Sequence, residues 1–107
     1  MKVFKNDNEA YQKWIISNPN AYVVNTKPDK SHNYRVAHRT SCRYIVGSNY
    51  PARSTKLYIK VCSEDPKEIA NWFTSNKTYF DGTFHECGKC LPQINQMINT
   101  VENTEQK

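Results

Sequence analysis

Two short clusters of metal-ligand residue types constrain the fold of this chain more than any other feature. Cys87 and Cys90 are separated by two residues, and His38 and Cys42 are separated by three. The two-residue spacer lets both sulfurs reach one ion, and a closed set of four nitrogen and sulfur ligands is typical of structural zinc. The sequence therefore predicts one zinc ion held by His38, Cys42, Cys87 and Cys90. Such a site requires the middle and the end of the chain to meet.

The ligand set has two alternatives within the chain. In one, Cys62 takes the place of His38, because it is the remaining cysteine. In the other, His85 competes for the ion, because it lies close to Cys87 in the sequence. Cys62 is expected to end a strand whose neighbours are packing residues, which favours His38 as the fourth ligand.

Catalytic chemistry has weaker support in the sequence. The pair of Cys87 and Cys90 also resembles a dithiol redox motif, but a single pair of this kind is a weak signal. A catalytic zinc needs an open coordination position, which four protein ligands do not leave. We interpret His32 and His85 as surface or supporting histidines. No catalytic residue is predicted, so an enzyme is the less favoured class.

The hydrophobic pattern predicts an α+β domain with a small antiparallel sheet. Segments rich in β-branched residues, or alternating between apolar and polar ones, predict strands over 21–26, 34–38 and 57–62. The first two of these strands are close in sequence and are expected to pair as a hairpin. A short extended segment over 83–86 leads into the cysteine pair.

About three helices are predicted to pack against this sheet around the zinc. The first begins at Asn6 or Asn8, either of which fits a capping residue. The second begins after Asp65, with Glu68 closing a capping box. The third follows Leu91 and carries apolar residues at helical spacing.

The length of 107 residues predicts a single domain, 1–107, whose polar end from residue 102 is expected to fray. The chain does not open with the apolar run of a signal peptide, and no stretch approaches membrane-spanning length. We therefore expect a cytoplasmic protein with no membrane partner. In a reducing compartment its cysteines are expected to bind metal rather than form disulfides.

Positive charge is concentrated in the middle of the chain. The whole chain has a net charge of +5, yet residues 27–60 contain eight basic side chains and a single acidic one, Asp29. Such a segment is the usual footprint of a polyanion partner, although a solvated surface produces the same composition. The residues expected to contact nucleic acid are Arg35, Arg39, Arg43, Arg53 and Lys56.

The order of these motifs resembles the zinc-binding domain of the Ada DNA-repair protein, copies of which are also appended to nucleases. The matching pieces are the pair of His38 and Cys42, the strand over 57–61, the helix over 65–73 and the segment 87–92. They cover about half of the chain. In Ada the first ligand is a cysteine that accepts a methyl group from DNA. Here that position is His38, so methyl transfer by the same residue is excluded.

The combined expectation is a small bacterial zinc-binding module that binds nucleic acid, with DNA favoured, through its basic segment. The alternative is a protein-interaction or inhibitor module that acts on a larger nucleic-acid enzyme such as a nuclease. Steeply salt-dependent binding to DNA or RNA favours the first reading. A discrete protein complex without nucleic-acid affinity favours the second.

Overall fold

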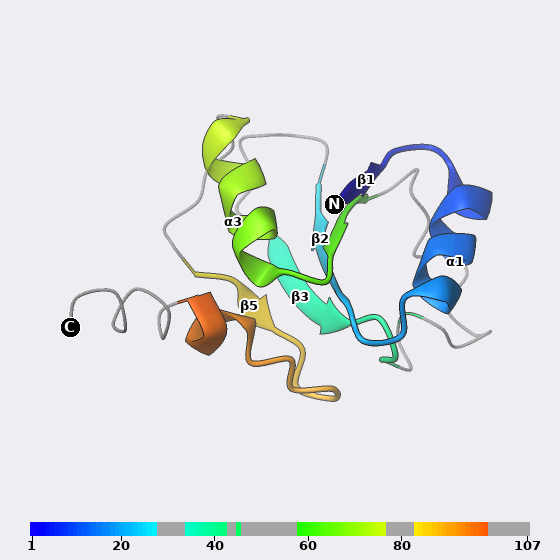
Figure 1. The fold of residues 1–107 in the computed structure, drawn as a ribbon. Coiled ribbons are helices and arrows are strands. Elements are labelled where there is room, and N and C mark those ends of the chain that lie inside the picture. The colour runs from blue at the N-terminus through cyan, green and yellow to red at the C-terminus, as the bar shows by residue number, and fades with distance from the viewer. Residues whose placement is uncertain (28–33, 43–44, 46–57, 77–82, 99–107) are drawn as a thin grey trace.

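A five-stranded mixed sheet with strand order β1-β4-β2-β3-β5 forms the centre of the chain. It is seen in a computed structural model that describes residues 1–27, 34–42, 45, 58–76 and 83–98 (Figure 1). The strands are β1 (Lys2–Phe4), β2 (Tyr22–Thr26), β3 (Arg35–Arg39), β4 (Ile59–Ser63) and β5 (His85–Glu86). The helices are α1 (Asn8–Ser17), α3 (Pro66–Ser75) and a helical segment over 94–98. The predicted α+β class is confirmed.

The predicted strands and the hairpin are confirmed, but the sheet is not wholly antiparallel. β2 lies between β3 and β4 and is antiparallel to both. β5 joins the free edge of β3 in the parallel direction, because the chain returns from α3 before it enters this strand. β1 was not predicted: it is a three-residue strand that pairs with β4, too short to give a periodic signal.

One face of the sheet packs against α3 and the segment over 94–98. Val24 lies opposite Ala37 on β3 and opposite Val61 on β4, so all three point to the same side. Ile69 and Phe73 of α3 pack on them, and all five residues are almost fully buried. This face holds the larger of the two apolar clusters and fixes α3 above the sheet.

The other face of the sheet packs against α1. Val23 lies opposite His38 on β3 and opposite Cys62 on β4. Tyr11 and Ile15 of α1 cover Val23 and Cys62 in a second apolar cluster. The face that receives α1 is therefore also the face on which His38 lies.

The first helix is capped by the residue that lies between the two predicted caps, Asn6 and Asn8. Asp7 is the capping residue, and its side chain accepts a hydrogen bond from the backbone N–H of Ala10 at 3.2 Å. Asn6 has a φ of 52°, so the chain makes a left-handed step just before the helix. Asn8 is already the first helical residue. The prediction of Asn6 or Asn8 as the cap was wrong, because adjacent Asn and Asp residues cap helices almost equally well.

The second helix is capped by Asp65, as predicted. Its side chain accepts a hydrogen bond from the backbone N–H of Lys67 at 3.0 Å. Glu68 does not close the box on the backbone of Asp65, which corrects that prediction. Instead Glu68 accepts the hydroxyl of Ser63, whose oxygen in turn accepts the backbone N–H of Asp65 at 2.9 Å. Ser63, at the end of β4, thus accepts the backbone N–H of Asp65 that Glu68 was predicted to accept.

Asp65→Ala is expected to lower the free energy of unfolding by about 1 kcal/mol, because the capping hydrogen bond is lost. Asn71→Ala, on the exposed side of the same helix, is the matched control and should change it by less than about 0.5 kcal/mol. Urea unfolding of the metal-loaded protein measures both values. Equal stability of the two variants would contradict the capping assignment.

Candidate metal centre

The structure brings together the four residues that the sequence predicted as ligands. Their ligand atoms, one from each of His38, Cys42, Cys87 and Cys90, all lie within 4.8 Å of one another. His38, Cys42 and Cys87 are buried, and Cys90 is half-buried. The cluster lies where the end of β3 meets the turn that follows β5.

The spacing of these atoms fits a tetrahedral metal site. The sulfurs of Cys42 and Cys87 are 3.9 Å apart. Two thiolates at about 2.3 Å from one tetrahedral ion are about 3.8 Å apart, whereas a disulfide needs about 2.05 Å. Nδ1 of His38 is buried, and it makes no hydrogen bond with any residue that the structure describes. A buried imidazole nitrogen of this kind is suited to a metal ion.

Parallel pairing of β5 with β3 carries Cys87 to the cluster. Glu86 lies opposite Ala37, and the backbone N–H of Cys87 then donates to the carbonyl of Ala37 at 2.9 Å. Side chains alternate along a strand, so Cys87 follows Glu86 onto the opposite face, the one that carries His38. Without this last strand the two halves of the site would not meet.

A buried threonine fixes the turn that carries Cys42. The Thr40 hydroxyl donates to the carbonyl of Asn18 at 2.6 Å, and its backbone N–H donates to the carbonyl of Ala21 at 2.9 Å. These bonds tie the end of β3 to the loop between α1 and β2. The backbone N–H of Cys42 then closes the turn on the carbonyl of Arg39 at 3.0 Å. Cys42 is therefore held by the fold and not only by a metal.

The segment from Cys87 to Cys90 is a tight turn, here called the knuckle. The carbonyl of Cys87 accepts the backbone N–H of Leu91 at 3.0 Å. Backbone N–H groups of Lys89 and Arg39 point at the sulfurs of Cys87 and Cys90, at 3.4 and 3.3 Å respectively. Such donors stabilise thiolates.

Two residues that hold the knuckle were missed at the sequence level. Asn95 brackets the backbone of Phe84, accepting its N–H at 2.8 Å and donating to its carbonyl at 2.7 Å. Glu86 accepts the backbone N–H of Ile94 at 2.8 Å and the amide of Asn95 at 3.1 Å. Both residues dock the segment over 94–98 onto β5. The sequence signal that could have indicated this contact is the position of Glu86, directly before Cys87 and shortly before a predicted helix whose first N–H groups need acceptors.

The three thiols resist simultaneous ionisation. Burial raises the pKa of Cys87, but hydrogen bonds from the amides of Cys90 and Lys89 and from the Cys42 thiol outweigh it, so the net pKa is lowered. Burial raises the pKa of Cys90 to about 12; the Arg39 amide opposes this, and the neighbouring Cys42 and Cys87 add to it. The lowered pKa of Cys87 and the raised pKa of Cys90 show that a thiolate at one position disfavours a second one beside it, an effect that a bound cation would reverse.

His38 is held in the neutral form that a metal requires. Burial, followed by the positive charge of Lys60, lowers its pKa to about 4. Lys60 is fully buried on the same face of the sheet and donates to the side-chain oxygen of Asn25 at 2.7 Å. The imidazole is therefore unprotonated at neutral pH and can donate a nitrogen lone pair to an ion.

Neither alternative ligand joins the cluster. Cys62 is fully buried in the α1 face, and burial raises its pKa to about 12, which keeps it a neutral thiol. His85 is exposed on β5, opposite Val36. His32 lies outside the described residues. His38 is therefore the fourth member of the group.

Of the five residues predicted to contact nucleic acid, the structure describes two, Arg35 and Arg39. Arg35 is 5 % exposed and its guanidinium lies 5.6 Å from the ring centre of Phe73, which places it within the packing between sheet and helix. Arg39 is half-buried beside the knuckle. Arg43, Arg53 and Lys56 lie outside the described residues.

Comparisons with protein-family models, with curated proteins and with solved structures gave no match to this chain. The resemblance to the zinc domain of Ada therefore stays a prediction. Among the residues that the structure describes, no helix has both the length and the apolar character needed to cross a membrane.

Cys87→Ser, Cys90→Ser and His38→Ala are each expected to abolish stoichiometric metal binding, because each removes one ligand of a closed site. Cys62→Ala is the matched control: it should keep the metal and cost about 1–2 kcal/mol of stability through lost packing. Elemental analysis after purification without added metal provides the measurement. Loss of metal in Cys62→Ala with retention in His38→Ala would reverse the ligand assignment.

The metal-free protein should lose stability as the pH falls from about 6.5 towards 4. In this window His38 binds a proton in the unfolded chain but not in the folded one, so acid favours unfolding. His38→Gln removes this contribution and should show a shallower loss. His85→Gln, at an exposed site, is the control. Urea unfolding with a chelator and a reductant tests this, and identical pH profiles for wild type and His38→Gln would contradict it.

Proposed function

We propose that this chain is a zinc-binding module that binds nucleic acid, with DNA favoured, at a surface beside its metal centre. Three thiolates and one imidazole in a tetrahedral arrangement favour zinc over the harder ions. Four protein ligands leave no position for a water molecule, so the zinc would act by folding the knuckle rather than by catalysis. Methyl transfer of the Ada type is not part of the proposal, because His38 occupies that position.

The observation that carries the proposal is the way Arg39 joins the metal centre to the basic segment. Its guanidinium donates to the carbonyls of Cys90 and Leu91 at 3.1 and 3.2 Å. These bonds use two of the five N–H groups of the side chain and leave others for a phosphate oxygen. A cation that is already immobilised loses little conformational entropy when it binds. The basic residues 43, 53 and 56 follow Arg39 along the chain.

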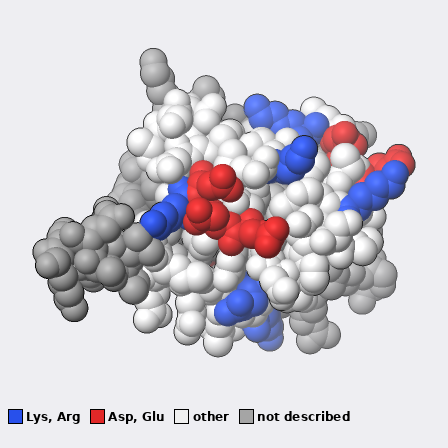
Figure 2. Space-filling view, in the orientation of Figure 1, with Lys and Arg blue, Asp and Glu red and all other residues white. Residues whose placement is uncertain are grey.

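Charge on the described surface limits the direction from which a phosphate backbone approaches. Figure 2 shows acidic side chains gathered near the centre of the face that carries α3, with basic side chains around them. Glu64, Asp65 and Glu68 come together there beside the start of α3. A polyanion would be repelled from this group, so the proposed contact runs along the side of Arg39 and the knuckle.

This acidic group also favours a second candidate, a protein-interaction module. A chain that carries both an acidic group and a basic segment suits a protein partner with complementary charge, such as a larger nucleic-acid enzyme. A stable complex with such an enzyme, formed by a protein without nucleic-acid affinity, would select this candidate.

Affinity for DNA or RNA should fall steeply as salt rises, because each phosphate contact releases condensed counterions. The triple variant Arg43→Glu, Arg53→Glu and Lys56→Glu should abolish binding and keep its metal. The matched control is Lys2→Glu, Lys5→Glu and Lys13→Glu, which makes the same charge change at exposed sites on β1, on α1 and between them. Fluorescence anisotropy over a series of salt concentrations is the measurement.

Two outcomes would contradict the proposal. A wild-type protein without affinity for any nucleic acid at low salt would remove its basis. Equal losses in the two triple variants would show that binding follows net charge alone and has no defined surface.

A further inference from the structure

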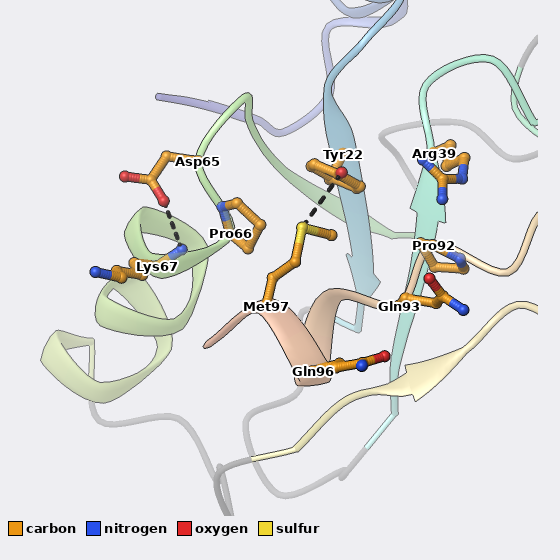
Figure 3. A pocket seen from close by; sticks show the side chains of 9 residues that line it. All are labelled: Tyr22, Arg39, Asp65, Pro66, Lys67, Pro92, Gln93, Gln96 and Met97. Atoms are coloured by element: carbon orange, nitrogen blue, oxygen red, sulfur yellow. Dashed lines mark hydrogen bonds between the residues drawn. The ribbon is translucent and has the colours of Figure 1, made fainter. Parts of the chain in front are cut away.

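A cavity of about 660 Å³ opens beside the knuckle, between the start of α3 and the segment over 94–98. Its volume lies in the range of sites that hold small organic groups. Tyr22 and Arg39 reach it from the sheet, Pro66 from α3, and Gln93, Gln96 and Met97 from the C-terminal side (Figure 3). The cavity is separate from the metal ligands but shares Arg39 with the knuckle.

The cavity has an apolar part and a polar part. Met97 points at Tyr22, whose hydroxyl donates to the Met97 sulfur at 3.6 Å, and Pro66 lies beside them (Figure 3). The amides of Gln93 and Gln96 are exposed, and neither makes a hydrogen bond within the described part of the chain. A flat apolar group with hydrogen-bonding edges would pack against the apolar part and hydrogen-bond to the side-chain amides of the polar part.

The backbone next to the cavity is strained. Leu91 and Gln93 have φ angles of 46° and 58°, in the left-handed region that non-glycine residues rarely adopt. Leu91 is also 60 % exposed, so burial of its side chain does not offset this cost. Strain of this kind persists where the surrounding structure imposes it, and it clusters at functional sites. Here the left-handed backbone of Gln93 sets the direction of its side chain.

We infer that this cavity holds one unpaired base of a single-stranded nucleic acid. The base lies against Tyr22, Met97 and Pro66, as bases do on aromatic and apolar side chains in single-strand binding proteins. Gln93 and Gln96 read its hydrogen-bonding edge, because carboxamides can pair with base edges in two directions. Arg39, fixed at the rim, takes the adjoining phosphate. Asp65 and Lys67 line the α3 side of the cavity, and the carboxylate of Asp65 disfavours a phosphate on that side. The inference rests on the proposed function and adds a preference for unpaired bases.

The test compares a labelled single-stranded DNA oligonucleotide with an abasic one of equal length. The abasic strand keeps every phosphate, so it reports the electrostatic contribution alone. Wild-type protein should bind the base-bearing strand about tenfold more tightly or better, since one stacked base is worth about 1–3 kcal/mol. The double variant Gln93→Ala and Gln96→Ala should lose part of this preference, because it removes the hydrogen bonds to the base edge and leaves the stacking surface in place. Gln12→Ala, exposed on α1, is the matched control.

A second measurement locates the base. The chain has two methionines, Met1 and Met97, so methyl NMR of labelled methionine gives two signals. Titration with the base-bearing strand should move the Met97 signal and leave Met1 unchanged, and the abasic strand should move neither.

The outcomes separate this inference from the proposed function. Equal, salt-dependent binding of both strands, or an unmoved Met97 signal, overturns the base site and leaves nucleic-acid binding intact. Absence of binding to both strands at low salt overturns the base site. If duplex DNA and RNA also fail to bind, the proposed function is overturned with it, and the protein partner is favoured.

Discussion

The constraint on which the rest of the structure depends is the crowding of three thiols and one imidazole in a single small group. Two sulfurs lie 3.9 Å apart, and a third thiol and an imidazole complete a group within 4.8 Å. Thiolates at this distance repel one another unless a cation lies between them. A bound divalent ion would turn the repulsion into a cross-link between the end of β3 and the knuckle. For a domain of 107 residues with a modest core, such a cross-link supplies folding free energy directly.

The buried ammonium of Lys60 in the sheet would balance the net charge of an occupied metal site. Three thiolates, a neutral imidazole and a divalent ion together carry one negative charge. Lys60 is fully buried on the sheet face that carries His38, hydrogen-bonded to Asn25 and 5.4 Å from the ring centres of Tyr11 and Tyr58. A buried ammonium is costly unless hydrogen bonds, aromatic faces or negative charge offset its desolvation. The same lysine contributes to the lowered pKa of His38, which favours its ligand form.

The sequence predicted what depends on neighbours along the chain and missed what depends on tertiary contact. Ligand spacing, strand alternation and the Asp65 cap are local signals, so the four ligands, the hairpin and the start of α3 could be predicted. The parallel pairing of β5 and the docking of Asn95 on Phe84 depend on where distant segments meet. Arg35 was expected at the surface as a basic residue in an alternating strand, but Phe73 of α3 packs over it. Composition does not show which charged side chains a helix will cover.

The central claim is that His38, Cys42, Cys87 and Cys90 bind one ion as a closed set. X-ray absorption spectroscopy at the metal edge of the purified protein tests it most directly, because it counts ligands by element and distance. We expect three sulfurs at about 2.3 Å and one nitrogen at about 2.0 Å from zinc. Four sulfurs would bring Cys62 into the site in place of His38. A shell of light atoms alone, with four free thiols, would contradict the metal centre itself.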